Sequence, residues 1–178
     1  MRRKRIVQWS AVGVVILVVF LVASGLIPGR APATDQGEAP VVGRAAPSLA
    51  LDTVDGGTVE LGQLRGTWVL LTFWTTWCPA CVAQEPYLQA AYDEMGGEVA
   101  FIAINLGESR ERVSRHISPD ITFSIALDVG QRIGVDYRIR YVPTTFAVDD
   151  GGIIRGIKVG PFGSKDDVIA WLDNLVRS

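Results

Sequence analysis

The stretch that decides the fold runs Trp68-Val-Leu-Leu-Thr-Phe-Trp-Thr-Thr-Trp-Cys-Pro-Ala-Cys81. Residues 68–74 are almost all apolar and rich in β-formers, which is typical of a strand buried on both faces in a central sheet. A helix is predicted to follow from Pro79 to about Met95, because proline is favoured at the first helical position. A strand that leads directly into a helix places the residues between them at the carboxyl edge of the sheet, where α/β proteins carry their functional sites.

Two cysteines, Cys78 and Cys81, stand at this junction, three residues apart. Residues at i and i+3 on a helix lie about 5–6 Å apart, within the range of a disulfide. Cys78 falls at the predicted N-cap, where unpaired N–H groups and the helix dipole stabilise a thiolate. We therefore expect Cys78, the more exposed, to attack a substrate disulfide and Cys81 to resolve the mixed disulfide. The alternatives are a structural disulfide, two idle core thiols or a two-ligand metal site.

The small number of metal-binding and disulfide-forming residues excludes several classes of site. The chain has two cysteines and one histidine, His116, so these side chains cannot complete a four-ligand zinc site within one chain. A multi-bridge disulfide scaffold is also excluded. His116 stands in a charged segment, and we predict it on the surface. We expect no metal site and no cofactor beyond a redox-active Cys78–Cys81 disulfide.

The segments around the core strand alternate between strand and helix patterns. Apolar runs predict strands, and turn residues such as Asp149-Asp-Gly-Gly152 predict hairpins. The segments expected in strands are 49–51, 58–61, 68–74, 99–105, 121–127, 144–148 and 153–159. The segments expected in helices are 79–95, 109–117, 129–137 and 164–176. This order predicts an α/β domain whose mixed sheet is covered by helices.

Length and composition fit one domain with a membrane anchor. The 178 residues are 48% hydrophobic and 20% charged, so the chain is neither disordered by composition nor long enough for two large domains. A net charge of −2 does not indicate nucleic-acid binding. Residues 1–5, however, hold four basic residues and no acid, whereas residues 31–178 have a net charge of −7. A basic tip before an acidic body indicates a membrane crossing.

Residues 6–27 carry no charged side chain. As a helix this run would be about 33 Å long, enough to cross a hydrocarbon core of about 30 Å. We expect residues 1–5 to stay in the cytoplasm, 6–27 to form a transmembrane anchor, and 28–47, rich in Pro, Gly and Ala, to form a linker. A cleaved signal peptide is the alternative. Both readings place the folded domain, residues 48–178, outside the cytoplasm.

Residues 73–81, Phe-Trp-Thr-Thr-Trp-Cys-Pro-Ala-Cys, resemble the active-site strand and turn of thioredoxin-fold proteins. More narrowly, residues from about 41 to 178 are similar to the TlpA/ResA/DsbE-type membrane-anchored thiol-disulfide oxidoreductases. Four further stretches carry this resemblance: VGRAAP at 42–47, LGQLRG at 61–66, AINLGES at 103–109 and VPTTF at 142–146. The resemblance implies a thioredoxin-like fold with an N-terminal β-hairpin and an insertion after the second core strand, preceded by a transmembrane helix.

The resemblance also implies roles for individual residues. Pro143 is expected in the cis form, facing the cysteine pair, although only about 5% of X–Pro bonds are cis. The backbone of Val142 is expected to pair with an extended substrate. Trp77, Pro79 and Thr144 are expected to border the substrate-binding groove.

Two departures from the family pattern leave the proton acceptor for Cys81 open. Thioredoxins carry a buried acid six residues before the first cysteine, where this chain has Thr72. Many ResA-like members carry an acid three residues after the second cysteine, where it has Gln84, followed by Glu85. A one-residue shift turns a helical side chain by about 100°. Glu85 is therefore either the proton-transfer group or a solvated helix charge.

The function implied is that of an extracytoplasmic thiol-disulfide oxidoreductase, single-pass in a bacterial cell membrane, that reduces protein disulfides. The resemblance points to apocytochrome c as substrate, during cytochrome c maturation, and to a transmembrane thiol carrier as electron donor. A thiol peroxidase is one alternative, because Thr75 fits the peroxidatic pattern P-x-x-x-T-x-x-C, although Leu71 occupies the proline position. A non-enzymatic copper-handling domain of the same fold is another.

Overall fold

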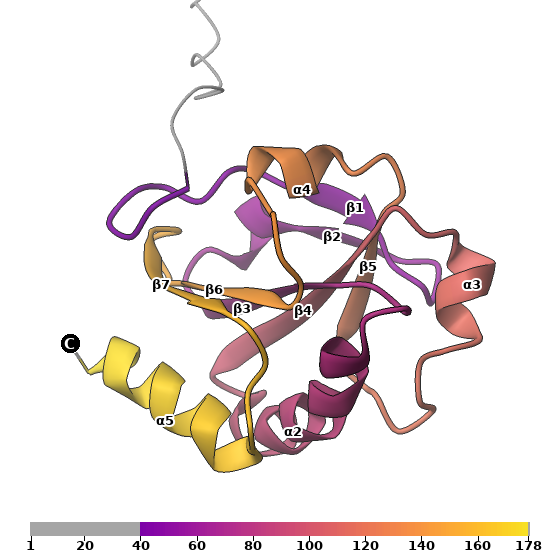
Figure 1. The fold of residues 1–178 in the computed structure, drawn as a ribbon. Coiled ribbons are helices and arrows are strands. Elements are labelled where there is room, and N and C mark those ends of the chain that lie inside the picture. The colour runs from indigo at the N-terminus through magenta and orange to yellow at the C-terminus, as the bar shows by residue number, and fades with distance from the viewer. Residues whose placement is uncertain (1–39, 178) are drawn as a thin grey trace, which may run out of the picture. The chain divides into compact units, whose positions relative to one another are not determined.

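The computed structural model describes residues 40–177, and their core is a five-stranded sheet. The strands lie in the order β5-β4-β3-β6-β7, with helices on both faces (Figure 1). In this sheet β3, β4 and β5 run parallel, whereas β6 is antiparallel to β3 and to β7. This arrangement confirms the predicted mixed sheet flanked by helices.

The elements follow the predicted order along the chain. The strands are β1 (Ala50–Asp52), β2 (Thr58–Glu60), β3 (Trp68–Trp74), β4 (Val99–Leu106), β5 (Ser124–Asp128), β6 (Thr144–Val148) and β7 (Ile154–Val159). The helices are the 3₁₀ turn η1 (Leu61–Leu64), α2 (Pro79–Met95), α3 (Arg110–Ser114), α4 (Arg132–Asp136) and α5 (Lys165–Val176). The antiparallel hairpin β1–β2 forms a separate two-stranded sheet.

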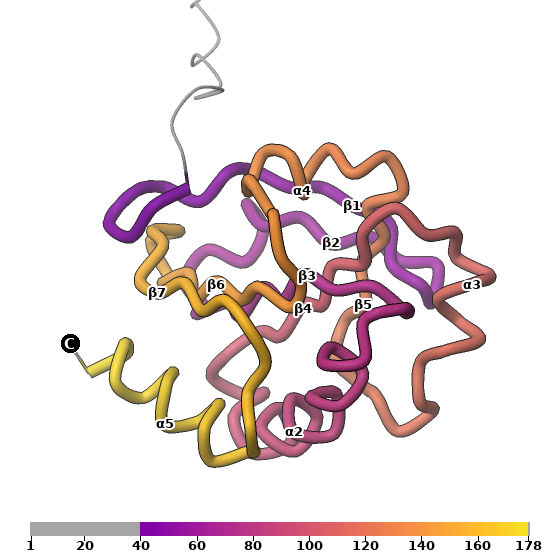
Figure 2. Tube along the Cα trace, in the orientation of Figure 1, coloured from indigo at the N-terminus to yellow at the C-terminus, as the bar shows by residue number. Residues whose placement is uncertain are grey.

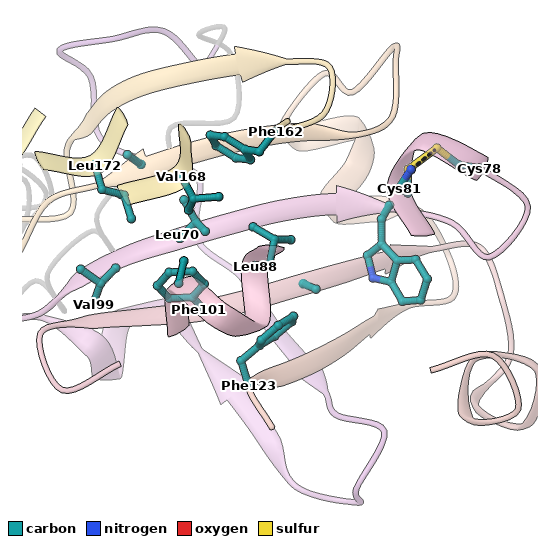
Figure 3. Close-up of a cluster of buried hydrophobic side chains, with 14 of the residues drawn as sticks. Leu70, Cys78, Cys81, Leu88, Val99, Phe101, Phe123, Phe162, Val168 and Leu172 are labelled. Atoms are coloured by element: carbon teal, nitrogen blue, oxygen red, sulfur yellow. Dashed lines mark hydrogen bonds between the residues drawn. A yellow bond between two sulfur atoms is a disulfide. The ribbon is translucent and has the colours of Figure 1, made fainter. Parts of the chain in front are cut away.

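Helices α2 and α5 cover one face of the central sheet. Alternate residues of β3, Leu70 and Trp74, pack there with Leu88 of α2 and with Val168 and Leu172 of α5. Their burial reflects the period of two along a strand and the apolar stripe of an amphipathic helix. Figure 3 shows that the cysteine pair closes one end of this cluster.

Helix α4, η1 and the β1–β2 hairpin cover the opposite face (Figure 1). The other set of β3 side chains points to this face and includes Phe73. Its ring packs against Tyr137 and Phe146, with ring centroids 5.0 and 5.8 Å away. Because both faces of β3 are buried in this way, its sequence reads as one continuous apolar run.

The two short helices are smaller than predicted. The helix expected over residues 109–117 spans only 110–114, and the one expected over 129–137 spans 132–136. Gln131, immediately before α4, has a φ of 56°, a left-handed conformation that a helix cannot continue through. The strand expected at 121–127 lies at 124–128 instead. The hydrophobic pattern is correct in each case, but local backbone geometry moves the ends.

The segment that enters the domain is bonded to the far end of the sheet. The Gly43 amide donates to the Ile154 carbonyl and the Ala46 amide to the Gly152 carbonyl. The expected anchor (6–27) and most of the expected linker (28–47) lie outside the described residues. Within residues 40–177, the helices are too short or too polar to cross a bilayer.

Candidate active site

The cysteine pair lies at the start of α2, directly after β3. Cys78 is the N-cap and Pro79 the first helical residue, as predicted. The two cysteines form a disulfide with a Cα–Cα distance of 5.2 Å. The Cys81 amide donates both to the Cys78 carbonyl at 3.0 Å and to the Cys78 Sγ at 3.2 Å, so an N–H group of the first helical turn points at this sulfur. Such a donor stabilises a thiolate when the disulfide opens.

The two cysteines are both buried and differ slightly in their exposure to solvent. Cys78 is 6% exposed and Cys81 is 2% exposed. The difference is small, but it has the predicted sign, and the neighbours of Cys78 are far more open. Trp77 is 67% exposed and Pro79 is also exposed. A partner can therefore approach Cys78 over an apolar, solvent-facing surface, whereas Cys81 is reached only through the protein.

The loop before β6 brings a backbone carbonyl to the reactive sulfur. The Val142–Pro143 peptide bond is cis, as predicted. The Val142 carbonyl oxygen lies 3.6 Å from the Cys78 Sγ. The Pro143 carbonyl accepts from the Gly160 amide at 2.8 Å, which ties this loop to the end of β7. These contacts fix the position of the Val142 backbone beside the disulfide.

Thr144, expected at the rim of the groove, is buried at the start of β6. Its hydroxyl donates to the Tyr141 carbonyl at 2.7 Å and therefore holds the loop from inside. Tyr141 is exposed instead, on the same loop as Val142. Sequence reasoning overlooked Tyr141, although its place two residues before Pro143 was a usable signal.

A small cavity lies behind Cys81, on the α2 face of the sheet. Its volume is about 10 Å³, close to what a single water molecule requires. Its wall includes both residues that depart from the family pattern, Thr72 and Gln84, together with Glu85. The Thr72 and Thr145 hydroxyls are 3.1 Å apart, and Gln84 accepts from the Phe162 amide at 3.1 Å. Neither Thr72 nor Gln84 can ionise, so each fills its position with a neutral hydrogen bond.

Glu85 is half-buried in this wall. Burial raises the pKa of its carboxyl from 4.5 to about 7. The Trp74 indole lines the same cavity, and its N–H is buried without a hydrogen-bond partner among the described residues. The cavity is therefore lined by Cys81, by the Glu85 carboxyl, whose pKa is about 7, and by the Trp74 N–H group, which has no partner among the described residues.

On the outer side of the active-site loop lies Glu108, which sequence reasoning missed as a site residue. Its carboxylate accepts from the Thr76 amide at 2.7 Å and from the Thr76 hydroxyl at 2.6 Å. The connection between β4 and β5 that contributes Glu108 runs outside the sheet edge (Figure 2). The stretch AINLGES had marked this region as a family feature, but nothing in the pattern linked Glu108 to Thr76.

His116 is exposed, as predicted, and its Nδ1 lies 2.8 Å from the Arg112 carbonyl. Across residues 40–177, no three His, Cys, Asp or Glu side chains are grouped so that they could hold a metal ion. The disulfide between Cys78 and Cys81 at the start of α2 is the group that offers chemistry here, and that chemistry is exchange between thiols and disulfides.

Comparison with known proteins identifies the family. The AhpC/TSA family profile matches residues 42–157. The thioredoxin-like protein YneN of Bacillus subtilis is 34% identical over 128 residues, covering 70% of this chain and 75% of YneN. The thiol-disulfide oxidoreductase ResA of Geobacillus kaustophilus is 31% identical over 178 residues, with 98% of each chain covered.

Solved structures show the same fold. StoA from Bacillus subtilis, at 27% identity, has a TM-score of 0.63 and covers 71% of this chain and 97% of its own. A thiol:disulfide interchange protein DsbE from Chlorobium tepidum, at 24% identity, has a TM-score of 0.69 and covers 78% and 96%. The chain therefore belongs to the AhpC/TSA family and, within the thioredoxin superfamily, to the TlpA/ResA/DsbE-type thiol-disulfide oxidoreductases.

Proposed function

We propose that this protein reduces protein disulfides outside the cytoplasm through Cys78 and Cys81. The observation that carries the proposal is the Val142 carbonyl held 3.6 Å from the Cys78 Sγ. An extended peptide can pair its backbone with Val142, as a strand adds to a sheet edge, and so bring its own disulfide to Cys78. The exposed Trp77 indole offers such a peptide an apolar contact beside the sulfur.

The reaction is a two-step exchange that starts from the reduced enzyme. The Cys78 thiolate attacks one sulfur of the substrate disulfide, the substrate S–S bond breaks, and one substrate thiolate leaves. The Cys81 thiolate then attacks the Cys78 sulfur and releases the second substrate thiol. Two electrons have passed to the substrate, and the enzyme disulfide seen here is the product. An external dithiol must reduce it again before the next cycle.

Glu85 is the group that takes the proton from Cys81 in the second step. The thiol must lose its proton before it can attack, and Cys81 is too buried to pass that proton directly to bulk water. Glu85 is the ionisable residue besides Cys81 in the cavity wall, and the cavity has room for about one water between them. A carboxyl that titrates near neutral pH accepts and releases a proton under working conditions.

The cellular setting is proposed from the N-terminal sequence and from the family. The basic tip at 1–5 and the uncharged run at 6–27 support a single-pass bacterial membrane protein whose domain faces away from the cytoplasm. Protein disulfides are then the substrates, with apocytochrome c as the specific candidate. A membrane-embedded thiol carrier is the source of reducing equivalents.

The test of the exchange reaction is a Cys81→Ser variant expressed in its membrane. This variant forms the mixed disulfide but cannot resolve it, so disulfide-linked partners accumulate on Cys78. They are released by dithiothreitol and identified by mass spectrometry, and the Cys78→Ser/Cys81→Ser double variant is the control. If the single variant captures no more protein than the double variant does, disulfide reduction is the wrong function.

The role of Glu85 is tested separately with Glu85→Gln. Release of a trapped model peptide from Cys78 should slow by about 100-fold, whereas alkylation of Cys78 should keep its rate. An unchanged release rate would remove Glu85 from the proposal. The same preparation tests the alternatives: rapid peroxide consumption in a Cys81→Ser background would favour a peroxidase, and tight Cu(I) binding by the reduced protein would favour a copper-handling domain.

A further inference from the structure

Glu108 is a buried acid with an unusually complete set of partners. Besides the two bonds from Thr76, its carboxylate accepts from the Asn105 side-chain amide at 2.8 Å and pairs with the Arg112 guanidinium at 2.8 Å. These partners come from three different places: the loop after β3, the end of β4, and helix α3. The Glu108 side chain is 7% exposed, whereas that of Arg112 is 52% exposed, so the carboxylate is buried beneath a partner that faces solvent.

The carboxylate is held in its ionised form. Burial acts to raise the pKa of Glu108, but the hydrogen bonds from Thr76 and Asn105 and the charge of Arg112 outweigh it and hold the pKa below its usual range. Charge-assisted hydrogen bonds are roughly twice as strong as neutral ones. A buried carboxylate with four such contacts is therefore a rigid anchor for whatever donates to it.

The loop that it anchors carries the reactive sulfur. Thr76 uses both its backbone N–H and its hydroxyl on Glu108, and the next two residues are Trp77 and Cys78. On the other side of Thr76, the Thr75 carbonyl accepts from the Cys78 amide at 3.3 Å. The turn that enters α2 is thus fixed from inside by this bond and from outside by Glu108. The exposed Trp77 stands between the two fixed points.

We propose that Glu108 is a positioning residue, which locks the turn bearing Trp77 and Cys78 in the orientation that a disulfide-bonded partner requires. Glu108 does not touch the sulfurs and acts through Thr76. The inference rests on thiol–disulfide exchange at Cys78, but not on the substrate, the direction of electron flow or the Glu85 relay. A misplacement of about 1 Å in a reacting group can lower the rate on the order of 100-fold. Holding the turn that bears Cys78 in place can therefore affect the rate although Glu108 does not contact the sulfurs.

The chain contains a matched control for this role. Asp149 is also 7% exposed and also pairs with an arginine, Arg155, at 2.6 Å. It accepts from the Ile153 amide at 2.7 Å and so fixes the β6–β7 hairpin in the way that Glu108 fixes the active-site turn. The hairpin lies at the end of β6 opposite Thr144, away from the cysteines. Both acids support local structure, but only Glu108 is bonded to the reactive turn.

The experiment compares Glu108→Gln with Asp149→Asn in the full-length chain in detergent. Each substitution keeps the side-chain shape and removes the charge. The measurements are kcat and KM for reduction of insulin disulfides with dithiothreitol as donor, the pH profile of Cys78 alkylation, and the urea midpoint of unfolding. Thr76→Val is the third variant, because it removes the hydroxyl that donates to Glu108 and accepts from Arg112 but leaves the Glu108 charge in place.

Both acid variants should unfold at lower urea than wild type. Glu108→Gln should also lower kcat/KM by about tenfold, mainly through a higher KM, and move the alkylation profile of Cys78. Asp149→Asn should stay within about twofold of wild type, and Thr76→Val should show a smaller loss of kcat/KM in the same direction as Glu108→Gln. The proposal is overturned if Glu108→Gln loses stability only, or if both acid variants lose activity equally. Should Glu108→Gln fail to fold, an unchanged kcat/KM in Thr76→Val overturns it as well.

Discussion

The two faces of the central sheet are packed in different ways. Under α4 and the β1–β2 hairpin, three rings interlock, since Tyr137 also packs against Phe146 at 5.1 Å and Phe73 contacts both. Under α2 and α5 the packing is apolar as well, but next to Cys81 it is interrupted by Thr72, Glu85 and a small cavity. Side chains fill the space among the three rings, whereas the other face leaves room for about one water beside Cys81.

This difference in packing shows that the domain carries a destabilising group, the Glu85 carboxyl, on the α2 face. A half-buried carboxyl with a raised pKa costs stability at neutral pH, because its charged form is poorly solvated. The ring cluster around Phe73 carries no such group, and it stabilises the strand that delivers the cysteines. We infer that the α4 face mainly supplies stability, and that the α2 face gives up part of its own for chemistry.

The largest effect should come from removing the nucleophile. Cys78→Ser should lower the rate of insulin-disulfide reduction on the order of a thousandfold or more, because serine cannot form the mixed disulfide. Its urea midpoint, compared with that of the reduced wild type, should change little. A large loss of stability would contradict the division between the faces, because it would make the reactive edge part of the structural core.

Removing a ring from the opposite face should lower stability and leave the chemistry of the cysteine pair unchanged. Phe73→Ala should lower the free energy of unfolding by about 3–5 kcal/mol, because Phe73 is fully buried and leaves a cavity. Circular dichroism during urea titration measures this loss. The reduction potential of the cysteine pair in the folded variant should stay the same, and a shift by tens of millivolts would show that the two faces are coupled.

Glu85→Gln should raise the free energy of unfolding, whereas Phe73→Ala lowers it, and the gain should appear only above about pH 4.5. The folded-state pKa of Glu85 is about 7 and its ordinary value is 4.5, so the native state binds more protons than the unfolded state between these values. Stability of the wild type therefore falls as pH rises from about 4.5 to about 7. The variant should be more stable by about 1–2 kcal/mol at pH 8.5 and equal at pH 4, as urea titrations at both pH values would measure; partial exposure keeps the gain below the full shift. Equal stability at pH 8.5 would mean that Glu85 is solvated.

The smallest effect concerns the one polar group of the ring cluster. Tyr137→Phe removes the hydroxyl that donates to the Pro47 carbonyl at 2.8 Å. The loss should be about 1 kcal/mol, measured by thermal or urea unfolding. Activity at Cys78 should not change, because this bond joins α4 to the entering segment on the face away from the cavity. A change in kcat/KM would show that the α4 face contributes to the reaction as well as to stability.

Sequence reasoning was reliable where one local signal decides the outcome. The core strand follows from a nearly continuous apolar run, and Cys78 and Pro79 occupy their predicted positions at the start of α2. The cis form of Pro143 came from the family resemblance, because local sequence gives only a weak preference. The fold and the reactive pair could therefore be predicted almost completely.

What could not be predicted depends on contacts between distant segments. The partners Glu108 and Thr76 are 32 residues apart and meet only because β3 and β4 are neighbours in the sheet. Adjacent helical residues such as Gln84 and Glu85 point about 100° apart, and this angle alone did not show whether Glu85 faces the cysteines. The cavity wall is wide enough to include both side chains. Side-chain roles at the edge of a sheet are thus set by topology, which a single stretch of sequence does not contain.

The attachment of residues 43–46 to the strand end near Ile154 has a consequence for encounters with other proteins. The reactive disulfide sits at the opposite end of the strands, beside Thr144 and Val159, so the chain enters the domain at the pole remote from its chemistry. A partner bound at the Ile154 end of the sheet would leave the sulfur-bearing pole uncovered. Large folded clients could then reach Cys78 without meeting the segment 43–46.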